Sequence, residues 1–397
     1  MLDEMKIKVR NLGKISWRPM LEHLVELHED SIHAPCYGLP YQWEEIAPER
    51  ELGILYGHWE TIHIALDALV LENKHGLNQI LNNLSLQQSD GLIPGHIAIV
   101  DEKIKWTTKS TFPPLWPMAI HDHLLKGDNK ELILKCFEIL KRQIGWFEKE
   151  RHSEDGGYYY LDCMDHFWES GVEHGIRYEF EEESPEVLSC IDATCHVYSM
   201  YKYAKLWSEI LDLNPTAWLS GETRIQNFIQ TYLYDEEQGF FYDSWAIENP
   251  KLKKHTFEGF WPMIVGAASP EQAQRLINEH LLDTNAFLTP HPLPTVALND
   301  PHFSPQSWRG ATYNSMTYWV TKGCFDYQRY DATAILIDKA LSKTYEIFQA
   351  TGALWECYHP LGEKPTSLKR PPLKVPCRNH LGHNPLIAMA NLWSKIN

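Results

Sequence analysis

The chain has 397 residues, 53 of them acidic and 36 basic, which gives a formal net charge of −17 at pH 7. This charge argues against nucleic acid and against an anionic membrane surface as partners. The eight cysteines are scattered without a CxxC pair, the N-terminus lacks the pattern of a secretion signal, and no apolar run approaches the length of a membrane span. The sequence therefore predicts a reduced, cytoplasmic protein whose cysteines are buried structural thiols.

Apolar residues recur at intervals of three and four along most of the chain, which predicts amphipathic helices. In chain order these cover residues 18–28, 59–81 (more than one helix), a short helix near 119–120, and 130–151, 192–211, 218–232, 260–268, 270–281, 311–322, 331–349 and 385–395.

Only short segments depart from the helical pattern. A turn is predicted at Gly91–His96 and a small aromatic β-hairpin at Asp235–Asp243, while long β runs are nearly absent. No change of composition marks a domain boundary. We therefore expect residues 1–397 to form a single all-α domain built from helix pairs, with residues 1–50 as an N-terminal extension of helix and loop.

The densest group of polar and aromatic residues lies at 168–178. Its glycines, Gly171 and Gly175, predict a loop or a helix entry. Trp–carboxylate pairs recur at Trp59-Glu60 and Trp355-Glu356. A solvated loop is one interpretation, although exposed ion pairs contribute only about 0–1 kcal/mol each to stability. The alternative is a site for sugar binding and glycosidic bond cleavage, which both use aromatic platforms beside carboxylates.

Four motifs in order carry a family resemblance: Trp59-Glu60; Glu169-Ser170-Gly171-Val172-Glu173 through Arg177-Tyr178; Trp308-Arg309-Gly310-Ala311; and Glu356-Cys357-Tyr358-His359-Pro360. With them the chain resembles the trehalase-like (α/α)6-barrel glycoside hydrolases, most closely the compact bacterial members of glycoside hydrolase family 63, which include mannosylglycerate and glucosylglycerate hydrolases. The resemblance implies an (α/α)6 toroid, or six-hairpin barrel, with a small β-hairpin insertion.

The resemblance also implies an inverting α-glycosidase for a small glucoside or mannoside, with Glu173 as general acid and Glu356 as general base. Such carboxyl groups lie about 6.5–9.5 Å apart so that a water fits between them. Arg177 is a candidate to orient Glu173, or to pair with it as a purely structural contact. The expected substrate-binding residues are Trp59, Glu60, Trp116, Trp168, Glu169, Arg177, Trp308, Arg309, Trp355 and Tyr358. For any one of these tryptophans, a place in the core is an equal alternative.

Two positions depart from the family pattern, which has Asp where this chain has Glu60 and Glu173. A shift of about 1 Å in a catalytic group can lower a rate on the order of 100-fold. Two other hypotheses therefore stay open: an acid-initiated cyclase or isomerase acting on a non-sugar substrate, and a non-catalytic sugar-binding relic.

The expected partner is a small-molecule substrate, a sugar, with no nucleic acid and no membrane, and nothing in the sequence indicates an oligomeric state. The histidine pairs lack the spacing of a metal site, and no GxGxxG motif or P-loop occurs. Neither a metal nor another cofactor is therefore predicted.

Overall fold

A computed structural model describes residues 2–36, 38–49, 54–71, 74–100, 103–106, 110–126, 129–163, 169–179, 188–371 and 373–397. Six of the described helices form an inner ring in which each contacts the next and the last contacts the first. These helices are α3 (His58–Val70), α5 (Trp116–Leu125), α7 (Ile191–Ile210), α10 (Trp261–Val265), α12 (Asn314–Asp326) and α14 (Leu386–Ser394). Helix α3 is buried on nearly all sides, as expected of a helix that is hydrophobic all round.

The outer layer alternates with this ring along the chain. Its helices are α2 (Arg18–Asp30), α4 (Lys74–Ser85), α6 (Lys130–Glu150), α8 (Thr216–Tyr232), α11 (Pro270–Arg275, continued by a π-helical turn, Leu276–Leu281) and α13 (Tyr330–Thr351). Helix α6 buries a single stripe that includes Ile133, Phe137 and Ile144, as its period predicts. The alternation confirms the predicted (α/α)6 toroid.

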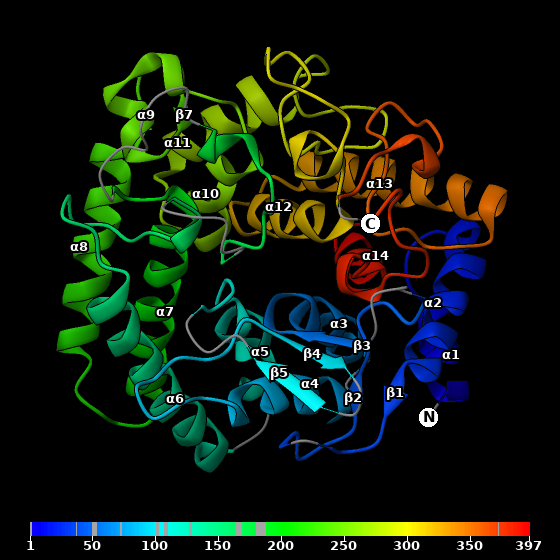
Figure 1. The fold of residues 1–397 in the computed structure, drawn as a ribbon, viewed down its shortest axis with the longest axis horizontal. Helices are drawn as coiled ribbons and strands as arrows, with labels where there is room; N and C mark the ends of the chain where they lie inside the picture. Colours follow the sequence, from blue (N-terminus) through cyan, green and yellow to red (C-terminus); the bar gives the residue numbers. More distant parts are fainter. Residues whose placement is uncertain are drawn as a thin grey trace.

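The chain goes round the toroid once, so that the C-terminal helix α14 returns beside α2 (Figure 1). Two short helices lie outside the two layers, α1 (Leu2–Val9), which packs on α2, and α9 (Ser244–Glu248). One buried apolar cluster extends from Val9 to Leu392. The single domain and its N-terminal extension remain predictions. None of the helices that the structure describes is long and apolar enough to cross a bilayer.

The β structure is only partly as predicted. The expected hairpin is present as β6 (Tyr234–Asp235) paired with β7 (Phe240–Phe241). A three-stranded antiparallel sheet was not predicted, and consists of β3 (Ile54–Gly57), β4 (His96–Val100) and β5 (Lys103–Trp106). Strand β1 (Ile32–His33) also pairs with β2 (Trp43–Glu44). Strands this short carry too few residues for their period to be distinguished from a helix or a turn.

A buried group of four titratable side chains joins the N-terminal segment to the ring. His28 contacts Glu44 at 2.6 Å and Asp67 at 3.5 Å, and Glu44 also contacts His75 at 2.7 Å. The other Asp67 oxygen accepts the backbone N–H of Ala388, at the start of α14. Burial alone would lower the pKa of His28, but Glu44 and Asp67 together raise it to about 10. His28 is therefore an imidazolium held between two carboxylates.

We expect this group to make stability depend on pH. Because the folded pKa of His28, about 10, lies above its usual value of about 6.5, its stabilisation is complete below pH 6.5 and is lost as the pH rises towards 10. The free energy of unfolding in urea should therefore fall more steeply between pH 6 and 10 in the wild type than in His28→Gln. A constant difference between the two proteins would contradict this assignment.

Candidate active site

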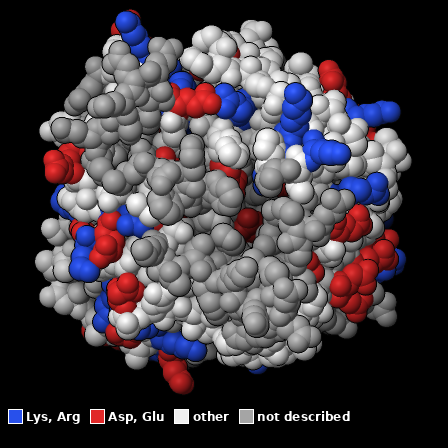
Figure 2. Space-filling model, in the orientation of Figure 1, with Lys and Arg blue, Asp and Glu red and all other residues white. Residues whose placement is uncertain are grey.

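The first turn of α3 and the segments before α7, α12 and α14 meet at one end of the ring. The Trp59 ring lies against Gly171, and the Glu60 side chain lies against Gly382. The ring of Trp308 contacts that of His383, with 5.6 Å between centroids. On the face in Figure 2, acidic side-chain atoms lie at the bottom of a central hollow. Three of the predicted site residues, Trp59, Glu60 and Trp308, therefore contact segments that are distant in the sequence.

Glu173 lies in the 169–179 loop, and its side chain is half-buried. Its Oε2 atom accepts a 2.8 Å hydrogen bond from the indole N–H of Trp308. Trp308 is itself fixed by stacking on Tyr313, with 3.7 Å between ring centroids and 7° between planes. The indole therefore orients one Glu173 oxygen, and the other accepts no hydrogen bond within the described part of the chain.

Glu169 anchors the loop that carries Glu173. Its Oε1 accepts from the Thr111 backbone and from Arg151 Nη2, and its Oε2 accepts from Arg151 Nε and from the Leu161 backbone, all within 3.0 Å. The side chain has 0% exposure. All of its hydrogen bonds are internal, so this placement does not support the predicted contact with substrate.

Arg177 is the centre of a second buried group. It forms two hydrogen bonds with Asp192 (2.9 and 3.0 Å) and two with Asp243 (2.6 and 3.0 Å), and it lies 3.3 Å from Glu258. Burial acts to lower the pKa of Arg177, but the carboxylates raise it overall. Arg177 makes no hydrogen bond or ion pair with Glu173 in the described structure, so neither the orienting role nor the pairing proposed for it is seen.

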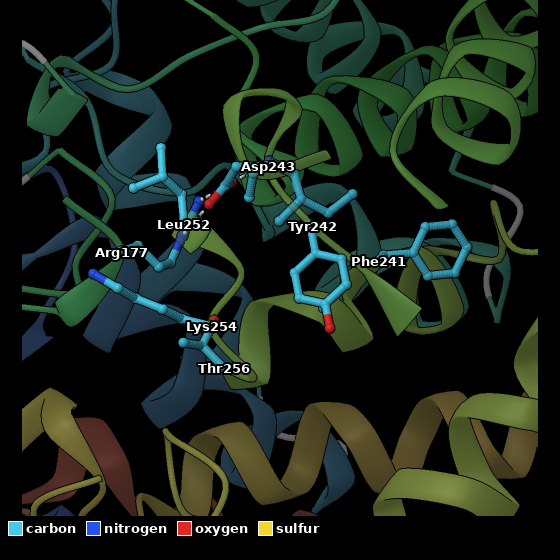
Figure 3. A pocket seen from close by; sticks show the side chains of 10 residues that line it. Arg177, Phe241, Tyr242, Asp243, Leu252, Lys254 and Thr256 are labelled. Carbon is cyan, nitrogen blue, oxygen red and sulfur yellow. Dashed lines mark hydrogen bonds and ion pairs between the residues drawn. The ribbon is translucent and has the colours of Figure 1, made fainter. Parts of the chain in front are cut away.

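Figure 3 shows Arg177 and Asp243 beside a small cavity, with Lys254 and Tyr242 on its other sides. The cavity volume is about 10 Å³. That volume is close to the lower limit for a single water, so the cavity does not accommodate a sugar. Cys190 lies close to Asp192 and Asp243 in a group with metal-like spacing. A cation there would meet the Arg177 guanidinium, and we do not interpret the group as a metal site.

Glu356 is buried, with 2% of its surface exposed. Its Oε1 accepts a 2.7 Å hydrogen bond from Arg370 Nε, and its Oε2 accepts from the Cys377 backbone at 3.1 Å. Burial alone would raise the pKa of Glu356, but Arg370, then His380, and the hydrogen bonds lower it to about 2. The Arg370 guanidinium also interacts electrostatically with Glu173. The two predicted catalytic carboxylates therefore share one cationic neighbour.

Three further predicted binding residues have roles in the packing. Trp116 donates its indole N–H to Gln143 at 2.8 Å, packs on Trp207 and has no exposed surface. The Trp355 indole donates to Thr351 (3.1 Å), and the Tyr358 hydroxyl donates to Asn384 (3.1 Å). Because these contacts hold the scaffold together, we leave the three residues out of the proposed site.

Of the remaining predictions, Trp59 and Glu60 lie at the start of α3, within the site end of the ring. Arg309 is half-buried, and both of its terminal nitrogens bind Glu179. Its guanidinium is therefore already paired within the protein and is not positioned to bind a carboxylate of a substrate. Trp168 lies outside the described residues.

Several residues of this region were not predicted. His380 stacks on His383, with 5.0 Å between ring centroids, and Arg370 pairs with Glu356. One buried oxygen of Glu258 accepts no hydrogen bond from the described part of the chain, and burial raises the pKa of Glu258 to about 7, although Arg177 opposes the shift. None of these residues falls in the motifs, and the only sequence signal was the close spacing of the two histidines.

The fold and the site define a class: a six-hairpin helical toroid with carboxylates among the loops at one end of its inner ring. The chain belongs to the mannosylglycerate hydrolase MGH1-like glycoside hydrolase domain family, whose model matches residues 57–367. It is therefore similar to the glycoside hydrolases of family 63.

Among curated proteins, an uncharacterized protein of Borreliella burgdorferi is 27% identical over 64% of this chain and 52% of its own length. The chain thus spans about half of that protein. Mannosylglycerate hydrolase MGH1 of Selaginella moellendorffii is 23% identical over 85% of this chain and 79% of its own length.

Solved structures share the fold. The family 63 mannosylglycerate hydrolase of Thermus thermophilus, in complex with glucose, matches with a TM-score of 0.73 at 19% identity, covering 94% of this chain and 99% of that one. The neutral trehalase Nth1 of Saccharomyces cerevisiae matches with a TM-score of 0.66 at 15% identity, covering 92% of this chain and 76% of that one. The Thermus hydrolase is also known in complex with Tris and D-glycerate.

Proposed function

We propose that the protein is an inverting α-glycoside hydrolase that cleaves a small α-linked glucoside or mannoside, with Glu173 as general acid and Glu356 as general base. The observation that supports the proposal is a buried, charged Glu356 bound by Arg370, whose guanidinium also interacts electrostatically with Glu173. The glucose and D-glycerate bound to the Thermus relative support a substrate of this size.

The two carboxyl groups are held differently, as the two roles require. Glu356, with a pKa of about 2, is ionised at neutral pH and can accept a proton from the attacking water. Glu173 has its Oε2 fixed by Trp308, which leaves Oε1 to give a proton to the leaving oxygen. Water attacks the anomeric carbon as the glycosidic bond breaks, and one proton moves to Glu356 while another leaves Glu173. Both carboxyl groups are then reset through solvent.

Trp59 and Glu60 are the proposed sugar-binding residues. Trp59 lies beside Trp261, and its buried indole N–H has no hydrogen-bond partner among the residues that the structure describes. Leaving a buried donor unpaired costs about 1–3 kcal/mol, so a sugar hydroxyl or a water is the expected acceptor.

The first experiment is a panel of α-glucosides, α-mannosides, trehalose and glycosylglycerates, followed by proton NMR during the first turnovers. We expect at least one substrate to be cleaved and the new sugar to appear first as the β anomer, because water attacks from the face opposite the leaving group. An α product would overturn inversion. If well-folded protein cleaves none of the panel, hydrolysis is rejected, and a calorimetric titration with the same sugars then tests the binding-relic hypothesis.

A further inference from the structure

Arg370 is held in a fixed orientation beside Glu356. Its Nε donates to Glu356 Oε1 at 2.7 Å, and its Nη1 donates to the Pro371 carbonyl at 2.7 Å. Only 9% of its surface is exposed. An ionised carboxylate as deeply buried as Glu356 is strongly destabilising without a partner, so this contact explains how Glu356 stays charged.

The other titratable groups around Glu356 do not replace this charge. Burial raises the pKa of Tyr313 and of the Cys357 thiol, which keeps both groups neutral. His380 acts in the same direction as Arg370 on Glu356, as the smaller of the two cationic influences. Arg370 is therefore the main cation that holds the proposed base in its charged form.

We propose that Arg370 is a positioning residue that fixes the plane of the Glu356 carboxylate and keeps that carboxylate charged. The inference rests on the proposed function only through the roles given to the two glutamates. The proposal predicts the direction in which the pH profile of the enzyme moves when Arg370 is replaced. Removing the cation raises the proton affinity of Glu356, so the acidic limb of the bell-shaped pH profile, which reports the general base, moves towards higher pH.

The test is the pH dependence of kcat/KM for the wild type, Arg370→Gln and Arg370→Lys. A cation at this distance lowers a carboxyl pKa by about 1–3 units, so we expect the acidic limb to shift by that amount in the glutamine variant. The lysine variant keeps the positive charge, so the limbs of its pH profile should stay at the wild-type pH values. Its rate should still fall, because an ammonium lacks the planar geometry of a guanidinium. A uniform loss of rate in Arg370→Gln without a shift of the acidic limb would show a merely structural role and overturn the proposal.

Arg378→Gln is the matched control. Arg378 lies in the same C-terminal segment, but it is half-exposed, packs over the Trp355 ring and pairs with Glu49. Removing it changes the net charge by the same amount without touching Glu356. We expect both limbs to stay where they are in the wild type.

A second readout does not depend on hydrolysis. In protein labelled with [δ-13C]glutamate, the Glu356 signal is assigned by its loss in Glu356→Gln and is then titrated. A midpoint near pH 2 in the wild type that rises in Arg370→Gln supports the proposal. A wild-type midpoint above pH 4 overturns it, even if the glutamine variant does not fold. If no sugar is cleaved but the titration is as expected, the hydrolase assignment fails while the role of Arg370 stands.

Discussion

Glu173→Gln and Glu356→Gln should each lower kcat/KM by about 100- to 10,000-fold on a substrate with a poor leaving group, since each removes one proton transfer in the transition state. Both variants should fold. Glu173 is only half-buried, and the amide oxygen of glutamine at position 356 can still accept a hydrogen bond from one of the two donors, Arg370 or the Cys377 backbone. Steady-state kinetics on the best substrate of the panel measures the loss.

The leaving group separates the two roles. When the substrate is a glycosyl fluoride, the fluoride ion leaves without being protonated, so Glu173→Gln should recover most of the wild-type rate. Glu356→Gln should stay impaired, because the attacking water still needs a base. Glu363→Gln is the control, because Glu363 lies in the same segment and its side chain is 64% exposed. Equal impairment of both variants on the fluoride would contradict the assignment of Glu173 as acid.

The sequence predicted the helices well wherever their period was strong. The predicted helix at 130–151 is α6, and that at 331–349 is α13, which begins one residue earlier and ends two residues later. Closure of the ring depends on the contact between α14 and α3, whose residues are over 300 positions apart, and no local pattern contains it. Only the family resemblance suggested the toroid.

The site was harder to predict, because burial decides the role of each side chain. Arg177 and Glu169 belong to one charged motif, and in the sequence both resemble residues that bind a substrate. In the structure both are buried and paired with other residues of the protein. Trp116 and Trp308 are equally buried, and only the partner of each indole N–H distinguishes the core residue from the site residue. No sequence motif marks Arg370 as a site residue. Its proposed role depends on its contact with Glu356, which lies fourteen residues earlier in the chain.

The second large effect concerns stability. We expect Arg177→Met to lower the free energy of unfolding by about 3–5 kcal/mol, because it leaves Asp192, Asp243 and Glu258 buried without their cation. Arg309→Met is the matched control, since it breaks the half-exposed pair with Glu179, and such pairs contribute at most about 1 kcal/mol. Urea unfolding of the three proteins at one pH gives both differences.

The pH dependence of the stability lost in Arg177→Met shows whether the loss comes from removing a charge or from removing packing contacts. Without Arg177, burial raises the pKa of all three carboxylates unopposed by that cation, so the folded variant binds protons more tightly than the unfolded chain. Its stability then falls as the pH rises through those raised values, and the deficit relative to the wild type should be smaller at pH 5 than at pH 8. A deficit that is equal at both pH values would mean that Arg177 stabilises the toroid by filling space. Arg177, which looked catalytic in the sequence, would then be a packing residue, and Asp192, Asp243 and Glu258 would have to be neutral in the wild type.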